Sequence, residues 1–436
     1  MNDYVEVAPT IGDSSWFTHA RFGMFIHWGL YSLGARHEWM KGREHMTNEQ
    51  YDKYFKRFDP DLYDPELWAR LADEAGMGYF VVTTKHHEGF CLWDSALTDY
   101  KATRTPAGRD LLRPMVDAFR GRGLRTGLYY SLLDWHHRHY TVDVKHPLRY
   151  DEAFLADQSN RDWQQYVEYL HGQTKELLSG YGPVDMMFFD FSIPPEEGFA
   201  GKGKDEWQSE RLIRTIRELQ PNILLNDRLG VRGDITTPEQ YQPREWIRVN
   251  GQRVVWEACH TFSGSWGYYR DEESWKSVDT LLKMLIDTVA KGGNLLLNVG
   301  PTGRGEFDAR AIDRLKGIGA WMRYHKRAIH GCTAAPERFA CPDDCRFTYD
   351  PQRRRLYLHV YSWPFKNIHL RGFSGQVEYA QLMHDTSEIR MVEGHKAMTM
   401  EAGAFNEGRP EDTLTLQLPV KQPNVTVPVI ELFLKD

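Results

Sequence analysis

The chain has 436 residues, of which 41% are hydrophobic and 26% are charged, and its formal net charge is −7. This composition is typical of a globular protein, and the length allows either one barrel-sized domain plus a smaller one or two to three ordinary domains. The negative charge argues against nucleic acid as a partner, and no apolar run approaches the roughly eighteen residues of a membrane span.

The cysteines and the N-terminus both indicate a cytoplasmic protein. The 5 cysteines are odd in number and widely spread, which predicts free thiols in a reducing compartment. The N-terminal stretch MNDYVEVAPTIGDSSW lacks the basic and apolar segments of a signal peptide. Cys332, Cys341 and Cys345 come close together without paired short spacings, so we predict no zinc site among them.

Up to about residue 330, short apolar runs alternate with longer amphipathic stretches. The apolar runs predict buried parallel strands at 22–28, 79–87, 125–131, 184–191, 223–228, 253–260 and 294–301. The amphipathic stretches predict helices at 64–76, 110–123, 162–180, 205–219 and 275–293. No GxGxxG motif follows the first strand, which argues against a dinucleotide-binding, doubly wound sheet. The pattern therefore predicts an α/β fold in which residues 1–330 form a (β/α)8-like, TIM-type barrel.

After about residue 335 the hydrophobic period changes to two. Alternating residues predict strands in RFTYDP, RRLYLHVYSW, NIHLRGF, QVEYAQLMHD, EIRMVE, DTLTLQLP and VPVIELFLKD. Turn residues separate these stretches. We expect residues 335–436 to form a small antiparallel β-sandwich domain.

Polar or ionisable residues follow the predicted barrel strands at their carboxyl ends, where barrel enzymes carry their chemistry. They are His27, His86, His87, Tyr130, Asp190, Asp227, Arg228, Glu257 and His260. A single residue of this kind has an ordinary structural explanation, as a cap or as a core hydrogen bond. Because most of the predicted strands end in such a residue, the pattern predicts a shared polar pocket.

Asp190 is the most informative of these positions, because it follows an apolar run in VDMMFFDFS. A buried carboxylate must be hydrogen-bonded or paired, and Arg228 on the next predicted strand is its natural counter-charge. An ionised carboxylate in a dry polar pocket suits nucleophilic attack at carbon. A purely structural Asp–Arg pair is the alternative that the spacing leaves open.

A carboxylate nucleophile that cleaves an acetal needs a second carboxylic acid about 5–5.5 Å away as the proton donor. Glu239 lies in TPEQ, in a loop after the fifth predicted strand, where it can swing over a leaving group. Glu257 lies inside a strand between Trp256 and Ala258, which favours a fixed structural or orienting role. The pattern leans toward Glu239 and leaves Glu257 as its rival.

A histidine-rich segment supports a different hypothesis. HHRH (136–139) follows Asp134 and looks like a metal-binding cluster, but no HExxH or CxxC motif accompanies it. A metal-dependent hydrolase is therefore one alternative, and a catalytically silent sugar-binding protein is another. We predict that the protein uses no metal and no cofactor.

Eight motifs follow one another along about residues 15–330. They are ARFGMFIHWGLYSLGARHEWM, FVVTTKHHEGFCLWDS, RDLLRPMVDAFRGRGLRTGLYYSLLDW, VDMMFFDF, NDR, TPEQ, WEACHTFSGSWGY and GGNLLLNVGPTGRGE. In this order they resemble the α-L-fucosidases of glycoside hydrolase family 29. The resemblance implies a (β/α) barrel with a β domain behind it. It also implies a retaining exo-glycosidase that removes terminal α-L-fucose through a covalent fucosyl-enzyme.

The resemblance further implies roles for individual residues. It makes Asp190 the nucleophile and Glu239 the acid/base, with Glu257 as the rival. It assigns a fucose pocket to His27, Glu38, Trp39, His86, His87, Tyr130 and Arg228, with Trp266 as an apolar wall and Tyr129 as an alternative to Tyr130. Many members have Trp-Phe-Asp-Gly at the nucleophile, whereas this chain has Phe188-Phe189-Asp190-Phe191. Phe191 therefore adds bulk on the leaving-group side.

A sugar pocket also explains the two adjacent imidazoles. We expect His86 and His87 to donate hydrogen bonds to fucose oxygens, and Lys85 and Glu88 to hold them in place. Adjacent strand residues point to opposite faces, so the strand must end or kink here if both are to reach one pocket. The expected partners are small fucosylated glycans or fucosides, and the short loops predicted over the pocket favour a homo-oligomer.

Overall fold

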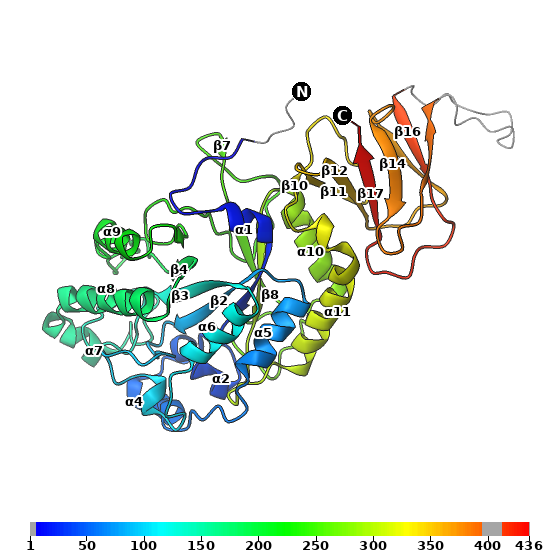
Figure 1. Ribbon diagram of the computed structural model, residues 1–436. Coiled ribbons are helices and arrows are strands. Elements are labelled where there is room, and N and C mark those ends of the chain that lie inside the picture. Colours follow the sequence, from blue (N-terminus) through cyan, green and yellow to red (C-terminus); the bar gives the residue numbers. More distant parts are fainter. Residues whose placement is uncertain (1–5, 395–411, 436) are drawn as a thin grey trace.

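The computed structural model describes residues 6–394 and 412–435. Figure 1 shows a parallel β-sheet surrounded by helices, followed by antiparallel strands in the C-terminal part of the chain. The predicted fold class is confirmed. Three segments lie outside the described residues: 1–5, 395–411 and 436. The first is the start of the stretch tested for a signal peptide, and the other two belong to the predicted β domain.

The parallel sheet forms the centre of the larger part of the molecule. Its strands are β1 (Phe22–Ile26), β2 (Tyr79–Lys85), β3 (Arg125–Ser131), β4 (Met186–Asp190), β5 (Leu224–Leu225), β8 (Glu257–Thr261) and β9 (Asn294–Val299). Their spatial order is β5-β4-β3-β2-β1-β9-β8. Nearly every residue on these strands is buried, as expected for parallel strands covered on both faces. Each strand lies within or overlaps an apolar run that predicted it.

Residues 234–240 close the sheet between its two edges. They make isolated parallel bridges on both sides, from Asn226 to Ile235 after β5, and from Thr236 to Trp256 and Glu239 to Cys259 along β8. Backbone bonds from Cys259 N to Pro238 O (3.1 Å) and from Gln240 N to Cys259 O (3.0 Å) hold this segment against β8. Glu239 therefore lies on the barrel wall, and not in the free loop that the sequence led us to expect.

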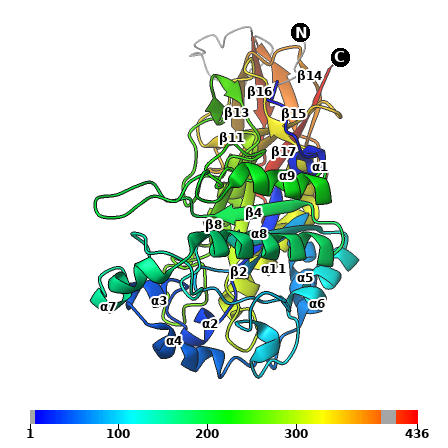
Figure 2. The ribbon, with the colours of Figure 1, turned by 90° about the vertical axis from the view of Figure 1, so that its left-hand side faces the viewer.

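Helices cover the outside of the sheet. The predicted ones are α5 (Pro65–Glu74), α6 (Leu112–Gly121), α8 (Trp163–Gly180), α9 (Ser209–Leu219) and α10 (Val278–Ala290). The side chains of Asp64, Asp162 and Ser277 cap α5, α8 and α10 by accepting from backbone N–H groups of the first turn. Figure 2 shows α8 and α9 on either side of β4. All five predicted helices are confirmed.

Further helices were not predicted from the sequence. They are α11 (Ala309–His325) and the short α1 (Ser15–Ala20), α2 (Tyr31–Gly34), α3 (Met40–Arg43), α4 (Asn48–Phe55) and α7 (Glu152–Ala156). The two glycines of α11 weaken its helical signal, but Gly319 is needed for its packing against α5. A β-carbon at Gly319 would lie 2.5 Å from the carbonyl oxygen of Glu74. Close approach between two helices therefore explains a residue type that helices otherwise disfavour.

The C-terminal strands form two packed antiparallel sheets. The five-stranded sheet has the order β10 (Thr333–Ala334), β11 (Cys345–Asp350), β12 (Arg355–Val360), β17 (Val429–Leu434) and β14 (Val377–Leu382). The three-stranded sheet has the order β13 (Asn367–Arg371), β16 (Thr413–Gln417) and β15 (Arg390–Glu393). Apolar residues from both sheets share one core, among them Leu358, Ile430, Leu370 and Leu416. This is the predicted β-sandwich.

A separate small hairpin pairs β6 (Arg248–Val249) with β7 (Gln252–Arg253).

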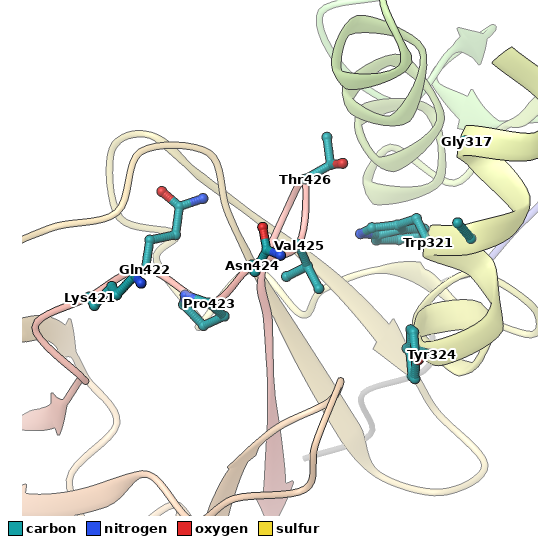
Figure 3. A pocket seen from close by; sticks show the side chains of 10 residues that line it. Gly317, Trp321, Tyr324, Lys421, Gln422, Pro423, Asn424, Val425 and Thr426 are labelled. Atoms are coloured by element: carbon teal, nitrogen blue, oxygen red, sulfur yellow. The ribbon is translucent and has the colours of Figure 1, made fainter. Parts of the chain in front are cut away.

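The barrel and the sandwich meet along α11. Trp321 Nε1 donates to the carbonyl oxygen of Val427 at 2.9 Å, and the main apolar core extends to Val427 and Val429. Figure 3 shows the groove beside this contact, of about 850 Å³, between α11 and residues 421–426. The predicted division into 1–330 and 335–436 stays a prediction. None of the described helices is long and apolar enough to cross a membrane.

Candidate active site

A small cavity lies at the carboxyl ends of the parallel strands. The side chains that line it are Phe25, His27, Trp39, His86, His87, Tyr129, Phe188, Asp190, Phe191, Arg228, Glu239, Cys259 and Trp266. Most of them are buried, whereas Trp39, Phe191, Arg228 and Trp266 are partly exposed and Glu239 is exposed. The buried side chains therefore form the floor and walls, and the partly exposed ones surround the mouth.

Asp190 ends β4 and points into this cavity with both carboxylate oxygens engaged. Tyr129 donates its hydroxyl to Oδ2 at 2.6 Å, and Arg228 Nη1 donates to Oδ1 at 2.6 Å. Burial alone would lower the pKa of Arg228, but the charge of Asp190 holds it well above its ordinary value. Burial and the same carboxylate raise the pKa of Tyr129, so its hydroxyl keeps the proton that it donates. Both oxygens of Asp190 are therefore held in place by strong hydrogen bonds.

Glu239 approaches Asp190 from the mouth of the cavity. Its Oε2 accepts from Arg228 Nη1 at 2.8 Å, which is the same nitrogen that contacts Asp190. Burial raises the pKa of Glu239 above its ordinary value, Arg228 opposes this, and the negative charge of Asp190 adds to it. A carboxyl group with a raised pKa beside a second carboxyl group is the arrangement of a proton donor and a nucleophile.

The two adjacent histidines reach one cavity because β2 is irregular at this point. The pairing register of β2 with β3 shifts between Thr83 and Lys85, as predicted for a strand that must end or kink. The rings of His86 and His87 consequently lie side by side, with centroids 3.9 Å apart. The interruption of the strand brings both imidazoles to the same face.

The hydrogen bonds of His87 change its predicted role. Its Nδ1 lies 2.7 Å from the hydroxyl oxygen of Ser131, and that hydroxyl donates its own proton to the carbonyl of Leu133 at 2.8 Å. Ser131 must therefore accept from His87 Nδ1. Burial lowers the pKa of His87 well below its ordinary value, so the ring is neutral and Nε2 is an acceptor. His87 can accept a hydrogen bond from a sugar hydroxyl, and the expectation of a donor is wrong here.

His27 is held in the same way. Its Nδ1 lies 2.6 Å from the amide oxygen of Asn298, which can only accept, so Nε2 is again left as an acceptor. Burial keeps the pKa of His27 well below its ordinary value. The amide nitrogen of Asn298 donates to the carbonyl oxygen of Trp266 at 2.6 Å. Asn298 thus orients both a histidine of the floor and an aromatic wall, a function that the sequence did not reveal.

The predicted supports of the histidine pair behave differently from one another. Glu88 Oε2 lies 3.5 Å from His86 Nδ1, but neither atom makes a hydrogen bond within the described residues, so Glu88 contacts the ring without fixing it. Lys85 instead donates to Asp134 Oδ2 at 3.0 Å, and its ammonium lies 4.3 Å from the ring centroid of Tyr130. Lys85 therefore stabilises the packing outside the barrel and does not support His86.

Tyr130 does not line the cavity, which corrects its predicted place in the pocket. Its hydroxyl donates to Gln173 Oε1 on α8 at 2.8 Å, on the outer face of β3. Ser131 pairs with Asp190 and Tyr129 pairs with Phe188, so Tyr129 shares the inner face with the residues of β4 that line the cavity. Because strand residues alternate between faces, only one of the two tyrosines can point inward, and it is Tyr129.

Glu257 also lies outside the cavity. It is the first residue of β8, at the end of the barrel opposite the site, where Tyr79 from the start of β2 donates its hydroxyl to Oε2. Burial raises the pKa of Glu257 to about 8. The structure therefore does not bring this rival acid/base together with Asp190. The reason is the direction of the strands: the cavity lies at their carboxyl ends, whereas Glu257 is at the start of β8.

The buried Glu257 carboxyl predicts a dependence of stability on pH. In the native state Glu257 keeps its proton up to about pH 8, whereas in the unfolded state it loses the proton at its ordinary pKa. The contribution of Glu257 to stability is therefore fully present below about pH 4.3 and decreases until about pH 8. We expect the free energy of unfolding of Glu257→Gln to rise relative to that of the wild type by roughly 1.4 kcal/mol for each pH unit across this window. Urea unfolding at several pH values measures it, with the exposed Glu245→Gln as control; parallel curves for all three proteins would contradict it.

Glu38 likewise does not line the cavity. Its Oε2 accepts from the backbone N–H of Gly267 at 2.8 Å and from the Ser265 hydroxyl at 3.2 Å. These bonds hold the segment that carries Trp266. Glu38 thus helps to position the apolar wall, and its predicted contact with fucose stays a prediction.

Several cavity residues were not predicted from the sequence. Phe25, Phe188 and Cys259 line the cavity, and each stands two residues from a position that the sequence singled out: His27, Asp190 or Glu257. The period of two in a strand was the available signal for the first two, because residues i and i+2 share a face.

The HHRH segment has structural partners of its own. The backbone N–H groups of His136 and His137 donate to Asp134 Oδ1 at 3.1 and 2.9 Å, and the His136 ring stacks on Tyr100 at 3.7 Å. Within residues 6–394 and 412–435, no group of three or more His, Cys, Asp and Glu side chains is placed to hold a metal ion.

Comparison with known proteins identifies the family. The alpha-L-fucosidase family profile matches residues 11–327. The chain belongs to the alpha-L-fucosidase family. It is 30% identical to the plasma alpha-L-fucosidase of Rattus norvegicus over 383 residues, which cover 80% of this chain and 78% of the relative. It is 29% identical to the plasma alpha-L-fucosidase of Homo sapiens, over 85% of this chain and 81% of the relative. This α-L-fucosidase is thus a glycoside hydrolase, as its motifs implied.

Solved structures agree with this membership. Alpha-L-fucosidase isoenzyme 1 from Paenibacillus thiaminolyticus superposes on this fucosidase with a TM-score of 0.89 at 42% identity, over 97% of this chain and 99% of that one. A GH29 fucosidase from Bacteroides thetaiotaomicron, trapped as a covalent intermediate, superposes with a TM-score of 0.83 at 26% identity, over 100% and 99% of the two chains. The fold is therefore shared over at least 97% of this chain, and the family match spans residues 11–327.

Proposed function

We propose that this protein is a retaining exo-α-L-fucosidase that works by double displacement, with Asp190 as the nucleophile and Glu239 as the acid/base. One observation carries the proposal. Arg228 Nη1 contacts Asp190 Oδ1 at 2.6 Å and Glu239 Oε2 at 2.8 Å, so these two oxygens cannot lie farther apart than the sum of the two distances. That upper limit is compatible with the roughly 5–5.5 Å between the carboxyl groups of retaining glycosidases, and it favours them over inverting ones, whose carboxyl groups are roughly 6.5–9.5 Å apart.

In the first step, an oxygen of Asp190 forms a bond with the anomeric carbon of fucose while the bond to the leaving oxygen breaks. Glu239 gives its proton to that oxygen. In the second step, water attacks the same carbon, Glu239 takes the proton from the water, and the ester bond to Asp190 breaks. The raised pKa of Glu239 supports this role, because the first step needs its protonated form at near-neutral pH.

The floor of the cavity suits a deoxy sugar. His27 and His87 offer neutral Nε2 acceptors, which can orient hydroxyl groups, and Asp190 lies 3.9 Å from His87 Nε2. The rings of Phe25 and Trp266, with centroids 5.8 Å apart, offer an apolar surface for the methyl group at C5. This division into polar and apolar walls supports fucose over a sugar with a hydroxymethyl group.

The shape of the site supports the exo mode. The residues of the floor are buried, and the partly exposed residues lie together at the mouth. A site that is closed at its floor accepts the end of a glycan and leaves no path for a chain that continues beyond the fucose. The expected substrates are therefore small fucosides or glycans with terminal α-L-fucose.

The stereochemistry of the first product tests the proposal. We expect proton NMR of an aryl α-L-fucoside digest to show α-L-fucose first, and β-L-fucose only later through mutarotation, because two displacements restore the configuration. Immediate formation of β-L-fucose would mean inversion and would contradict the double displacement. Free α-L-fucose added to buffer is the control for the rate of mutarotation.

Two further expectations stay predictions. The cytoplasmic location lacks support from the relatives, several of which are named as plasma proteins. The homo-oligomer is the second, and the molecular mass in solution would test it.

A further inference from the structure

Phe191 directly follows Asp190 and has an unusual backbone conformation. Its φ is 73°, in the left-handed region that a bulky side chain rarely adopts. Other described residues that are not glycine also have positive φ, but Phe191 is the one among them that lines the cavity. Strained residues of this kind persist where the surroundings fix them, and they cluster at functional sites.

The chain after Phe191 is held firmly. Ser192 donates its hydroxyl to the carbonyl oxygen of Arg228 at 2.8 Å and accepts from Trp207 Nε1 at 3.2 Å. Ile193 and Lys202 then exchange two backbone hydrogen bonds of 2.8 Å. Because these contacts fix the backbone on the C-terminal side and β4 fixes it on the other, the ring of Phe191 has a defined position beside the nucleophile.

This ring lies at the mouth of the cavity. Its centroid is 5.3 Å from that of Trp39 and 4.9 Å from that of His87, whose ring it meets edge-on. Phe191 and Trp39 are both partly exposed, whereas His87 beneath them is buried. The two aromatic side chains therefore form one wall between the floor and the solvent.

The leaving group must pass this wall. Asp190 attacks from the buried side, and the leaving oxygen has to meet Glu239, which is also at the mouth. We propose that Phe191, backed by Trp39, is the wall on which the leaving group packs, and that it selects leaving groups with a flat apolar face. This inference rests on the proposed function, since it uses the roles of Asp190 and Glu239.

Two kinds of leaving group have a flat apolar face that can pack on this wall. An aromatic ring stacks on an aromatic wall, and a pyranose does so through the face that carries its axial C–H groups. A leaving group of a single atom cannot reach the wall. α-L-Fucosyl fluoride, an aryl α-L-fucoside and an α-L-fucosyl-galactose disaccharide therefore separate contacts of the fucose from contacts of the leaving group.

Two variants of Phe191 separate the ring from the backbone strain. Phe191→Ala removes the ring and keeps a β-carbon at positive φ, whereas Phe191→Gly removes both. We expect both to lower kcat/KM for the aryl fucoside or the disaccharide on the order of tenfold more than for the fluoride. Phe191→Gly should also melt at a higher temperature than Phe191→Ala, the reverse of the usual order, because only glycine adopts this φ without strain.

Phe365→Ala is the matched control, because Phe365 is 76% exposed in the β-sandwich; its kinetics should equal those of the wild type. A larger loss on the aryl fucoside or on the disaccharide supports the proposal and assigns the preferred leaving group. Equal losses on all three substrates, or no loss, would overturn it while leaving the fucosidase assignment intact. Failure of the wild type on every substrate, the fluoride included, would instead overturn the proposed function.

Discussion

Asp190→Gly is expected to lower kcat for an aryl α-L-fucoside on the order of 10³-fold or more, because it removes the group that forms the covalent bond. Asp190 accepts hydrogen bonds from Tyr129 and Arg228, so the variant also leaves a space beneath the anomeric carbon. A small anion can occupy that space. Sodium azide should restore turnover and yield β-L-fucosyl azide, since the anion attacks from the face that the carboxylate used.

The product makes this experiment decisive. Recovery of activity with β-L-fucosyl azide as product identifies both the reaction and the nucleophile, whereas activity close to that of the wild type without azide would exclude Asp190. The exposed Asp205→Gly provides a matched control, with full activity and no response to azide. Circular dichroism of all three proteins tests whether the fold is kept when Arg228 loses its partner.

Glu239→Ala is expected to have an effect that depends on the leaving group. A poor leaving group such as a sugar needs protonation, so its kcat/KM should fall by roughly 10²–10⁴-fold, whereas an activated nitrophenyl fucoside should lose far less in the first step. The ratio of the two losses is the measurement. Equal losses would contradict the acid/base role of Glu239.

The pH profile provides a second readout for the same variant. An acid catalyst must be protonated, so activity on a poor leaving group falls as pH rises through the pKa of Glu239, and the raised pKa moves that fall to higher pH. Glu239→Ala should lose this basic limb. Glu257→Gln should keep both the limb and the ratio between substrates, because Glu257 lies at the opposite end of the barrel.

The position of the site could be predicted because burial leaves a strong pattern in a sequence. Apolar runs that end in His27, Asp190 or Arg228 marked the strands and also their active ends, since every parallel strand in a barrel delivers its carboxyl end to the same side. Three features outside this pattern could not be predicted from the sequence. They are the glycine-bearing α11, the bridge formed by residues 234–240, and the anchoring role of Asn298. Each depends on contacts between segments that are distant in the chain.

The sequence by itself determined the barrel, the β-sandwich and the set of ionisable residues from which the site is drawn. The tertiary structure alone decided which of them meet. Tyr129 and not Tyr130 faces Asp190 because the register of β3 against β4 fixes the inner face. Glu239 and not Glu257 shares Arg228 with Asp190 because residues 234–240 pair along β8. Local periodicity encodes burial, whereas register and closure arise from pairing between strands, which no single segment of sequence specifies.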